Sequence, residues 1–269
     1  MKNPISMSTR ISKKMDNTDN NKKIYKDVPT ASTFGTEGSS FLIEEISMLQ
    51  LGDSFFPTGM YTTSSGLETL FYDKKIRTKE EILEFITVCL KYQIGPADCA
   101  ALSNAYEFAK EGNLSKIIEV DQILFSMKLI KDIRNASIRS GTQLLSCLLS
   151  FVKDNNLISS YYSSIKNKAA NGVYPVALAV ASNSLGIKKE RACLILLYGF
   201  IVSIVGAGLR LGILQHLEAQ QIIHELKPII TVVINDNMNR NYSHLWQFSP
   251  GIDLVQMKHE KMDSKMFIT

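Results

Sequence analysis

Hydrophobic residues recur at intervals of three and four along most of the chain after residue 40. The segment from Phe41 carries Leu42, Ile46 and Leu49 at helical spacing, and Thr78 with Glu81 three residues later has the form of a capping box that opens another amphipathic run. Alternation with a period of two is nearly absent, and no Asn-Gly or Asp-Gly turn separates strand-like runs. The pattern predicts an all-α fold, a single-domain helical bundle of about eight to ten helices.

Punctuating residues suggest where several helices begin and end. An Ala-rich helix over 97–110 should stop at Glu111-Gly112-Asn113, and a helix opened by Pro175 should stop at Gly186. We expect one long helix over 121–152, because a single internal glycine does not end a helix. Pro228 is expected to start a last apolar piece.

The first forty residues differ from the rest. They lack helical periodicity, are rich in Asn, Ser, Thr, Lys and Asp, and carry seven basic against four acidic residues. The opening MKNPISMSTR has no apolar stretch of the kind a secretory signal needs. We therefore predict a disordered basic and polar tail (1–40), a helical domain (41–239) and an amphipathic C-terminal docking tail (240–269).

The net charge of +4 leaves only +1 for residues 41–269, because 1–40 carries +3. A body so close to neutral has no electrostatic footprint for nucleic acid. The four cysteines lie far apart without a CxxC pair, which is typical of free thiols in a reducing compartment.

One stretch, residues 192–209, has eighteen residues without a charge and qualifies as a candidate membrane span. At 1.5 Å per residue it would cover only about 27 Å, short of a hydrocarbon core of about 30 Å. Gly199, Ser203, Gly206 and Gly208 would equally suit close packing inside a bundle. Both interpretations stay open on these grounds, with a buried core helix favoured.

Motifs for chemistry are missing. The chain has no GxxxxGK[ST], GxGxxG, HExxH or GxSxG, and its four histidines never stand four residues apart as a helical metal site requires. We therefore expect no catalytic constellation, no cofactor and no metal site. Adjacent acidic pairs such as Glu44-Glu45 point to different sides of a helix.

Three stretches ask for a specific role. The loop from Ser54 to Glu68 contains a proline, two glycines and a run of hydroxyls, and the segment 206–220 places Arg210 and Gln220 after a long apolar helix. The C-terminal tail has an amphipathic stripe at Ile252, Val255, His259, Met262 and Met266. Such a terminal stripe either folds back on the chain or docks on another protein, and methionine suits an adaptable docking surface.

Taken in order, these stretches resemble the UreF family of urease accessory proteins. The loop is similar to the family pattern P-x-G-x-[FY]-x-x-S-x-G-L-E, met here by Pro57, Gly59, Tyr61, Ser64, Gly66, Leu67 and Glu68. Further likenesses are RNASIRSGTQLL over 134–145, VYPVALAVASNSLGI over 173–187, Arg210-Leu211 with Gln220, and a tail with His259, Glu260 and Phe267. The chain departs from the family where Thr63 replaces a common Tyr or His, and where Lys265 and Ile268 replace basic positions of the tail, Lys265 an arginine.

The resemblance implies a cytoplasmic, all-helical, dimeric scaffold without catalysis of its own. Such a scaffold joins UreD (also called UreH) to the P-loop GTPase UreG, and together they insert nickel into apo-urease. On this interpretation the tail, with His259, Glu260, Lys265 and Phe267, binds UreD. The partner-binding candidates elsewhere are Pro57, Gly59, Tyr61, Glu68, Arg210 and Gln220, of which Tyr61, Glu68 and Arg210 would support the dimer or the face that receives UreG.

Two other functions remain open from sequence. A small helical enzyme could clamp an anionic substrate with Arg134, Arg139 and Arg210 and use Glu68 as base, provided that these residues line one pocket. A regulator of GTP hydrolysis could supply Arg210 as an arginine finger.

Overall fold

The computed structural model describes residues 37–153 and 155–269. Contacts set Glu44–Thr269 apart as one compact unit, and this unit contains the helical bundle. The helix expected from Phe41 begins at Glu37, four residues inside the predicted tail, and the rest of that tail, residues 1–36, lies outside the described residues.

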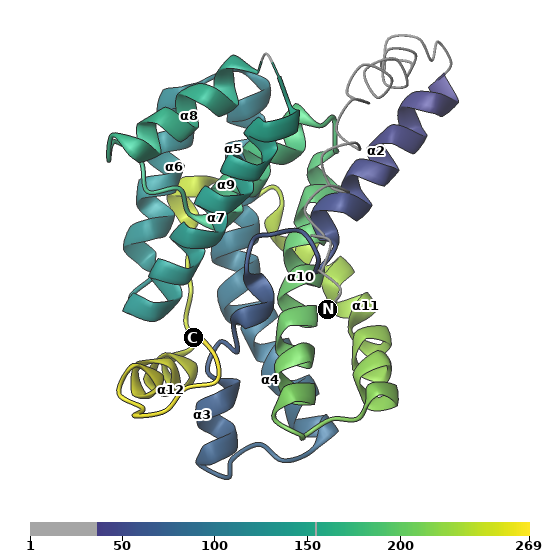
Figure 1. Ribbon diagram of the computed structural model, residues 1–269, viewed down its shortest axis with the longest axis vertical. Coiled ribbons are helices and arrows are strands. Elements are labelled where there is room, and N and C mark those ends of the chain that lie inside the picture. Colours follow the sequence, from purple (N-terminus) through teal and green to yellow (C-terminus); the bar gives the residue numbers. More distant parts are fainter. Residues whose placement is uncertain (1–36, 154) are drawn as a thin grey trace, which may run out of the picture. The chain divides into compact units, whose positions relative to one another are not determined.

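The regular elements of the described chain are helices, it contains no strand, and the predicted all-α fold is confirmed (Figure 1). The capping box at Thr78 is present, with both of its hydrogen bonds to Glu81 formed. The α-helices are α2 (Glu37–Gly52), α3 (Leu67–Tyr72), α4 (Lys79–Cys89), α5 (Ala100–Lys110), α6 (Leu114–Met127), α7 (Lys131–Phe151), α8 (Asn156–Lys166), α9 (Tyr174–Ser184), α10 (Lys189–Arg210), α11 (His216–Asn237) and α12 (Pro250–Glu260).

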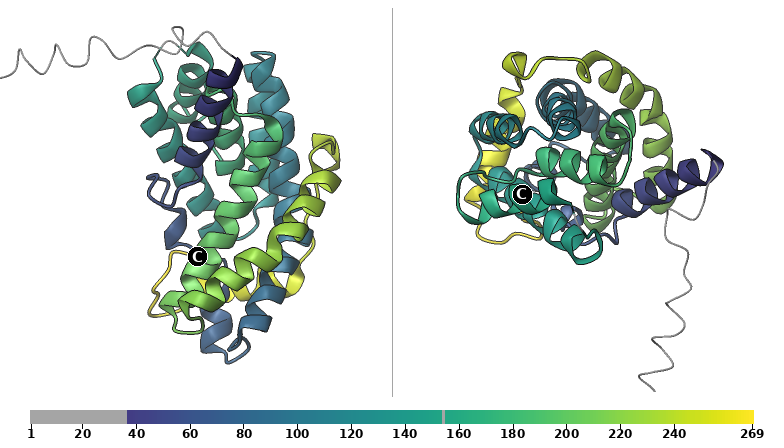
Figure 2. Two further views of the ribbon diagram at one scale, coloured as in Figure 1. Left: turned by 90° about the vertical axis from the view of Figure 1, so that its right-hand side faces the viewer. Right: turned by 90° about the horizontal axis from the view of Figure 1, so that it is seen from above.

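The core lies where α9 and α10 are enclosed by their neighbours. α9 packs against α5 and α7, and its Ala- and Val-rich surface is buried on nearly every side. α10 packs against α9, α5, α4 and α11, and both views of Figure 2 place α11 alongside it. α10 is long and apolar enough to cross a membrane, but 67% of its most apolar window is buried inside this fold. It therefore packs as the core helix of a bundle does.

A π-helix, η4 (Leu90–Cys99), joins α4 to α5 and contains Gly95 and Pro96. Pro96 has no N–H for a helical hydrogen bond, and a Cβ on Gly95 would stand 2.7 Å from the carbonyl oxygen of Leu90. The wide π turn accommodates both, and places Asp98 inside the protein.

The single helix expected over 121–152 is wrong, because α6 ends at Met127 and α7 begins at Lys131. Lys128 and Ile130 have ψ angles of 86° and 123°, outside the helical region. The break turns Lys128 inward, where its ammonium pairs with the buried Asp98 at 2.7 Å. The chain gives up helical hydrogen bonds here and gains a buried ion pair.

Pro228 does not start a helix either, since it lies inside α11. Its missing N–H removes one hydrogen bond, and the apolar positions Leu226 and Ile230 on either side remain buried. Packing of this face against α10 and α4 keeps the helix continuous.

A second buried carboxylate, Asp121 on α6, holds the turn before α9. It accepts hydrogen bonds from the Tyr161 hydroxyl (3.0 Å) and from the backbone N–H groups of Asn171, Gly172 and Val173. Four donors satisfy the buried charge, so Asp121 acts as a structural anchor.

Candidate functional site

The loop between α2 and α3 has the backbone path that its glycines require. Gly59 and Gly66 have φ angles of +75° and +98°, in the left-handed region that favours glycine, and a short 3₁₀ helix, η3 (Met60–Thr62), follows the first. A Cβ on Gly66 would stand 3.1 Å from Val255 and 3.2 Å from Gln256 of α12. The missing side chain therefore lets the C-terminal tail approach this loop.

The C-terminal tail folds back on the chain. α12 packs against α3 and α7, and Ile252, His259 and Phe267 are buried. The inner side of the terminal stripe therefore folds back on the chain, which is one of the two possibilities that the sequence left open. Met266, the last stripe residue, stays exposed.

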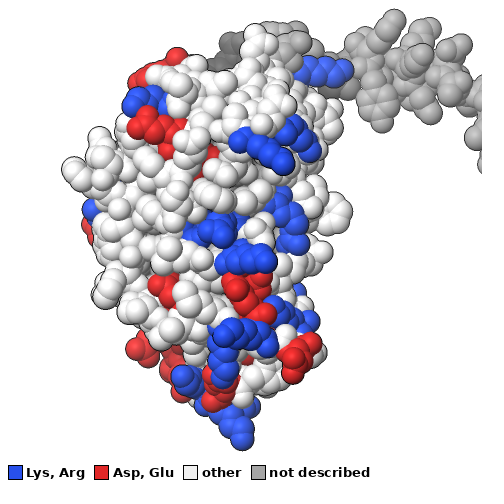
Figure 3. Space-filling model, turned by 90° about the vertical axis from the view of Figure 1, so that its left-hand side faces the viewer, with Lys and Arg blue, Asp and Glu red and all other residues white. Residues whose placement is uncertain are grey.

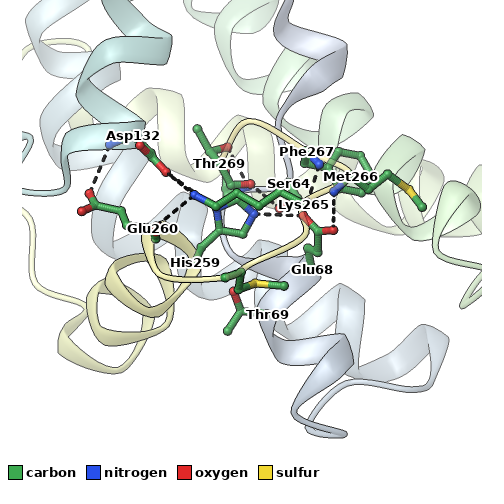
Figure 4. A network of polar contacts seen from close by, with 12 residues as sticks. Ser64, Glu68, Thr69, Asp132, His259, Glu260, Lys265, Met266, Phe267 and Thr269 are labelled. Atoms are coloured by element: carbon green, nitrogen blue, oxygen red, sulfur yellow. Dashed lines mark hydrogen bonds and ion pairs between the residues drawn. The ribbon is translucent and has the colours of Figure 1, made fainter.

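Glu68 is the centre of this contact, and neither it nor His259 is more than 1% exposed (Figure 4). One carboxylate oxygen lies 2.9 Å from Nε2 of His259 and accepts from the N–H of Phe267 at 3.2 Å. The other oxygen accepts from the N–H of Met266 at 2.7 Å. A buried carboxylate with three donors holds both the end of α12 and the segment beyond it.

Backbone pairing continues the contact beyond Glu68. The N–H of Ile268 donates to the carbonyl of Thr62 (3.0 Å), and the N–H of Ser64 donates to Thr269 (3.1 Å). The Ser64 hydroxyl also donates to the Thr269 backbone oxygen. The last residues thus lie across the loop like an added strand partner, held by main-chain atoms.

Ion pairs surround the buried contact. Oδ2 of Asp132, at the start of α7, lies 3.2 Å from the Lys265 ammonium and 3.9 Å from Nδ1 of His259. The side chain of Glu260 accepts from the N–H of Asp132 at 3.2 Å, and Lys258 pairs with Asp73. Sequence reasoning missed Asp132, because nothing around it in the chain signals a contact with so distant a tail.

Arg210 joins the loop, the tail and α10. Its guanidinium lies 4.3 Å from the centre of the Phe267 ring, and it donates to the carbonyls of Gly206 (3.1 Å) and Tyr61. Burial lowers the pKa of Arg210 from its ordinary value. Because the cation is tied to a buried ring and two carbonyls, it is poorly placed as a mobile arginine finger.

The structure brings together most of the candidate residues. Tyr61, Glu68, Arg210, His259, Glu260, Lys265 and Phe267 belong to the contact between loop and tail, which we call the tail clasp. Gly59 lies in the same loop but faces Arg139 and Gln143 of α7. Pro57 is exposed earlier in the loop, and Gln220 is exposed on α11. These two stay as predicted partner contacts only.

The residues proposed for an anion-binding enzyme are each engaged by other groups of the protein. Arg134 stacks on Phe125 at 5.2 Å, while Arg139 lies 3.4 Å from the Thr62 hydroxyl and Arg210 is tied to the tail. Glu68 is fully buried and both of its oxygens accept from protein donors, so the carboxylate does not face solvent where a substrate could reach it. In the part of the chain that the structure describes, no three His, Cys, Asp or Glu side chains are grouped to hold a metal ion.

Charges on the face beside the tail are mixed. Figure 3 shows basic and acidic side chains alternating over its lower half and few charges on much of the upper half. Around the tail, Lys265 pairs with Asp132 and Lys258 with Asp73. Such a face offers no continuous basic stripe for a phosphate backbone.

The described chain is an all-α domain whose C-terminal helix packs against the chain's own loop and α7, and whose Arg210 is bound by protein groups. These features are typical of a protein-binding helical domain. The family model UreF matches residues 76–227. Urease accessory protein UreF of Trichodesmium erythraeum is 34% identical over 85% of this chain and 98% of its own length, and that of Bacillus sp. TB-90 is 28% identical over 83% and 98%. Urease accessory protein UreF of Haemophilus influenzae is 23% identical over 82% and 94%. The chain belongs to the UreF family of urease accessory proteins.

Proposed function

We propose that this chain is a non-catalytic cytoplasmic scaffold that bridges UreD and the GTPase UreG during nickel insertion into apo-urease. Family membership supports a role in urease maturation. The observation that carries the scaffold proposal is the tail, whose inner face is held by Glu68 while its outer face remains open.

The outer face of α12 is the surface we assign to UreD. Leu254 is 68% exposed and Met257 43% exposed, one turn apart, and Met266 is exposed beyond the helix end. Apolar side chains presented on a rigid helix suit a helix-in-groove contact. The Glu68 clasp would then fix the angle at which this face meets its partner.

The dimer face we assign to α10. Leu194 (38% exposed) and Tyr198 (40% exposed) stand one turn apart as a ridge, with a hollow on each side. One hollow is lined by Met48, Leu49 and Val202, the other by Ile223, Ile230 and Ile234. A ridge between two apolar hollows is suited to a two-fold contact in which each copy inserts its ridge beside the other.

The face for UreG we assign to the loop around Tyr61, whose ring is exposed and whose carbonyl is held by Arg210. Pro57 is exposed in the same loop. The tail clasp stabilises this loop through Ser64 and Thr62, so partner binding at the tail would be felt at the loop.

Co-purification with UreD and UreG, read by size-exclusion chromatography with light scattering, tests the proposal. We expect a complex with two copies of this chain. Leu254→Glu with Met257→Glu should abolish UreD binding, whereas Lys261→Glu, at the exposed residue directly after the helix, should not. Tyr198→Glu should leave UreD binding unchanged and give a complex that contains one copy of the chain.

A chain that remains alone with both partners present would refute the scaffold proposal. Retention of UreD by the double variant, or by a chain lacking residues 250–269, would refute the tail assignment alone. Two copies in the Tyr198→Glu complex would move the dimer face elsewhere.

A further inference from the structure

A hollow of about 80 Å³, measured as the space open to the centres of water-sized spheres, lies behind the tail clasp. Its walls come from the loop, η4, the break after α6, α7, α9, α10 and the tail end, represented by Ser65, Ile94, Lys128, Ser137, Pro175, Phe200 and Thr269. By this measure a water molecule needs roughly 10–15 Å³. The hollow therefore has room for about five to eight water-sized groups, enough for a molecule of a few non-hydrogen atoms.

The Lys128–Asp98 pair forms the polar part of the wall, and both side chains are more than nine-tenths buried. An ammonium has three N–H donors, and in the described chain the Lys128 ammonium donates only to Oδ1 of Asp98. Oδ2 of Asp98 likewise has no donor among the residues described. Oδ2 of Asp98 is not among the enclosed polar atoms that lack a partner, so it opens on the hollow. The hollow therefore favours an occupant that both accepts from Lys128 and donates to Asp98.

The charge of the occupant follows from the same pair. Lys128 and Asp98 are the charged side chains among the residues that line this hollow, and they cancel. An added anion or cation would be buried without a counter-charge, which is strongly unfavourable. A neutral molecule meets the requirement.

The remaining walls refine the ligand class. Leu196, Phe200 and Ile133 are apolar, and the hydroxyl of Ser137 accepts from the N–H of Tyr174 at 3.0 Å, so its own proton can go to an acceptor. We propose that this hollow binds a small neutral amide, whose carbonyl oxygen accepts from Lys128 and whose N–H donates to Asp98. Its carbon end would meet the apolar wall.

Binding is linked to the tail. Thr269 lines this hollow, and Asp253 and Gln256 of α12 line a smaller one of about 40 Å³ on the other side of the Lys128–Asp98 pair. Both hollows take part of their wall from the docked tail. A ligand that binds only the docked state stabilises that state, so an amide in this hollow would hold the tail closed.

Acetamide is the probe, applied to the full chain at millimolar concentration with saturation-transfer NMR. We expect transfer from the protein to the acetamide methyl group, and none to acetate or methylammonium, which carry a charge. In the double variant Asp98→Leu with Lys128→Met the transfer should fall to background. Removing both partners together avoids an unpaired buried charge that could unfold the chain. Lys131→Met, an exposed change close in sequence, is the matched control and should keep the transfer.

Hydrogen exchange gives a second readout that a surface-binding probe would not move. Acetamide should slow exchange at the amides of Met266 and Phe267 in the unaltered chain and leave it unchanged in the double variant. Absent transfer to acetamide in the unaltered chain would mean that water alone fills the hollow and would overturn the proposal. Equal transfer in the double variant, or equal transfer to acetate, would overturn it as well.

Discussion

Replacement of Glu68 by glutamine should release the tail while leaving the helical core folded. The side chain keeps its size, but the amide has one acceptor oxygen and an NH₂ group in place of a carboxylate that receives His259, Met266 and Phe267. Hydrogen bonds to a charged group contribute about 1.5–3 kcal/mol each. The loss of one such bond, and the weakening of the other two, should cost the docked tail about 3–4 kcal/mol.

This cost applies to local opening, because the tail can leave without unfolding the bundle. At about 1.4 kcal/mol for each factor of ten, amide protection at 266 and 267 should fall by about two to three powers of ten. Hydrogen exchange with mass spectrometry measures it directly, with the α5 segment 100–110 as internal reference. Glu260→Gln, exposed and with a single backbone donor, is the matched control and should change protection little.

Unchanged protection at 266 and 267 in Glu68→Gln would refute the assignment of the carboxylate as the holder of the tail. Equal loss over α5 would mean that Glu68 stabilises the whole domain instead. Only loss confined to the tail fits the contacts described for Glu68.

Three further changes test other parts of the structure. Phe267→Ala removes a buried ring and its contact with Arg210, and should weaken tail docking by about 3–5 kcal/mol. The tail should then be cleaved faster by proteases, and an unchanged cleavage rate would contradict this role of the ring. Gly141→Ala places a methyl group against the Gly172 carbonyl where α7 meets the turn before α9, and should lower the melting temperature by several degrees. An unchanged melting temperature would mean that stability does not depend on the close approach of Gly141 to Gly172. Burial alone would raise the pKa of Glu44, but hydrogen bonds from the Lys188 backbone and the Arg191 side chain lower it below 4.5 overall. The stability that the Glu44 carboxylate contributes is therefore present above that pH and is lost as the pH falls through the lowered pKa. Glu44→Gln should reduce stability at pH 7, and the difference in melting temperature from the parent should shrink in acid.

Helical periodicity and capping residues predicted the fold class and most of the helices, because these features act within one or two turns of the chain. The break at Lys128 could not be predicted this way. It depends on Asp98, thirty residues earlier, whose position follows from the π-helix around Pro96. The apolar spacing continues across the break, so the local pattern gives no sign of the ion pair that Lys128 forms there.

The candidate site was predictable in part. The glycines and hydroxyls of the loop and the stripe of the tail stood out as needing a specific role, and the family likeness joined them. That Glu68 and His259 meet each other could not be read from positions 191 residues apart. Asp132 and the backbone donors of Met266 and Phe267 have no signature in the sequence, because any residue type supplies an N–H.

The folded-back tail has a thermodynamic consequence for association. A chain segment that becomes ordered only on binding loses backbone and side-chain freedom at that moment, and the loss, roughly 1–2 kcal/mol per residue for the backbone alone, is subtracted from affinity. Here the eleven residues of α12 are ordered before any partner binds, because the helix and the segment after it are already bound to the loop. A partner that meets this helix can therefore bind tightly through a small contact area, and a mutation in the loop that touches no partner should weaken binding chiefly through entropy.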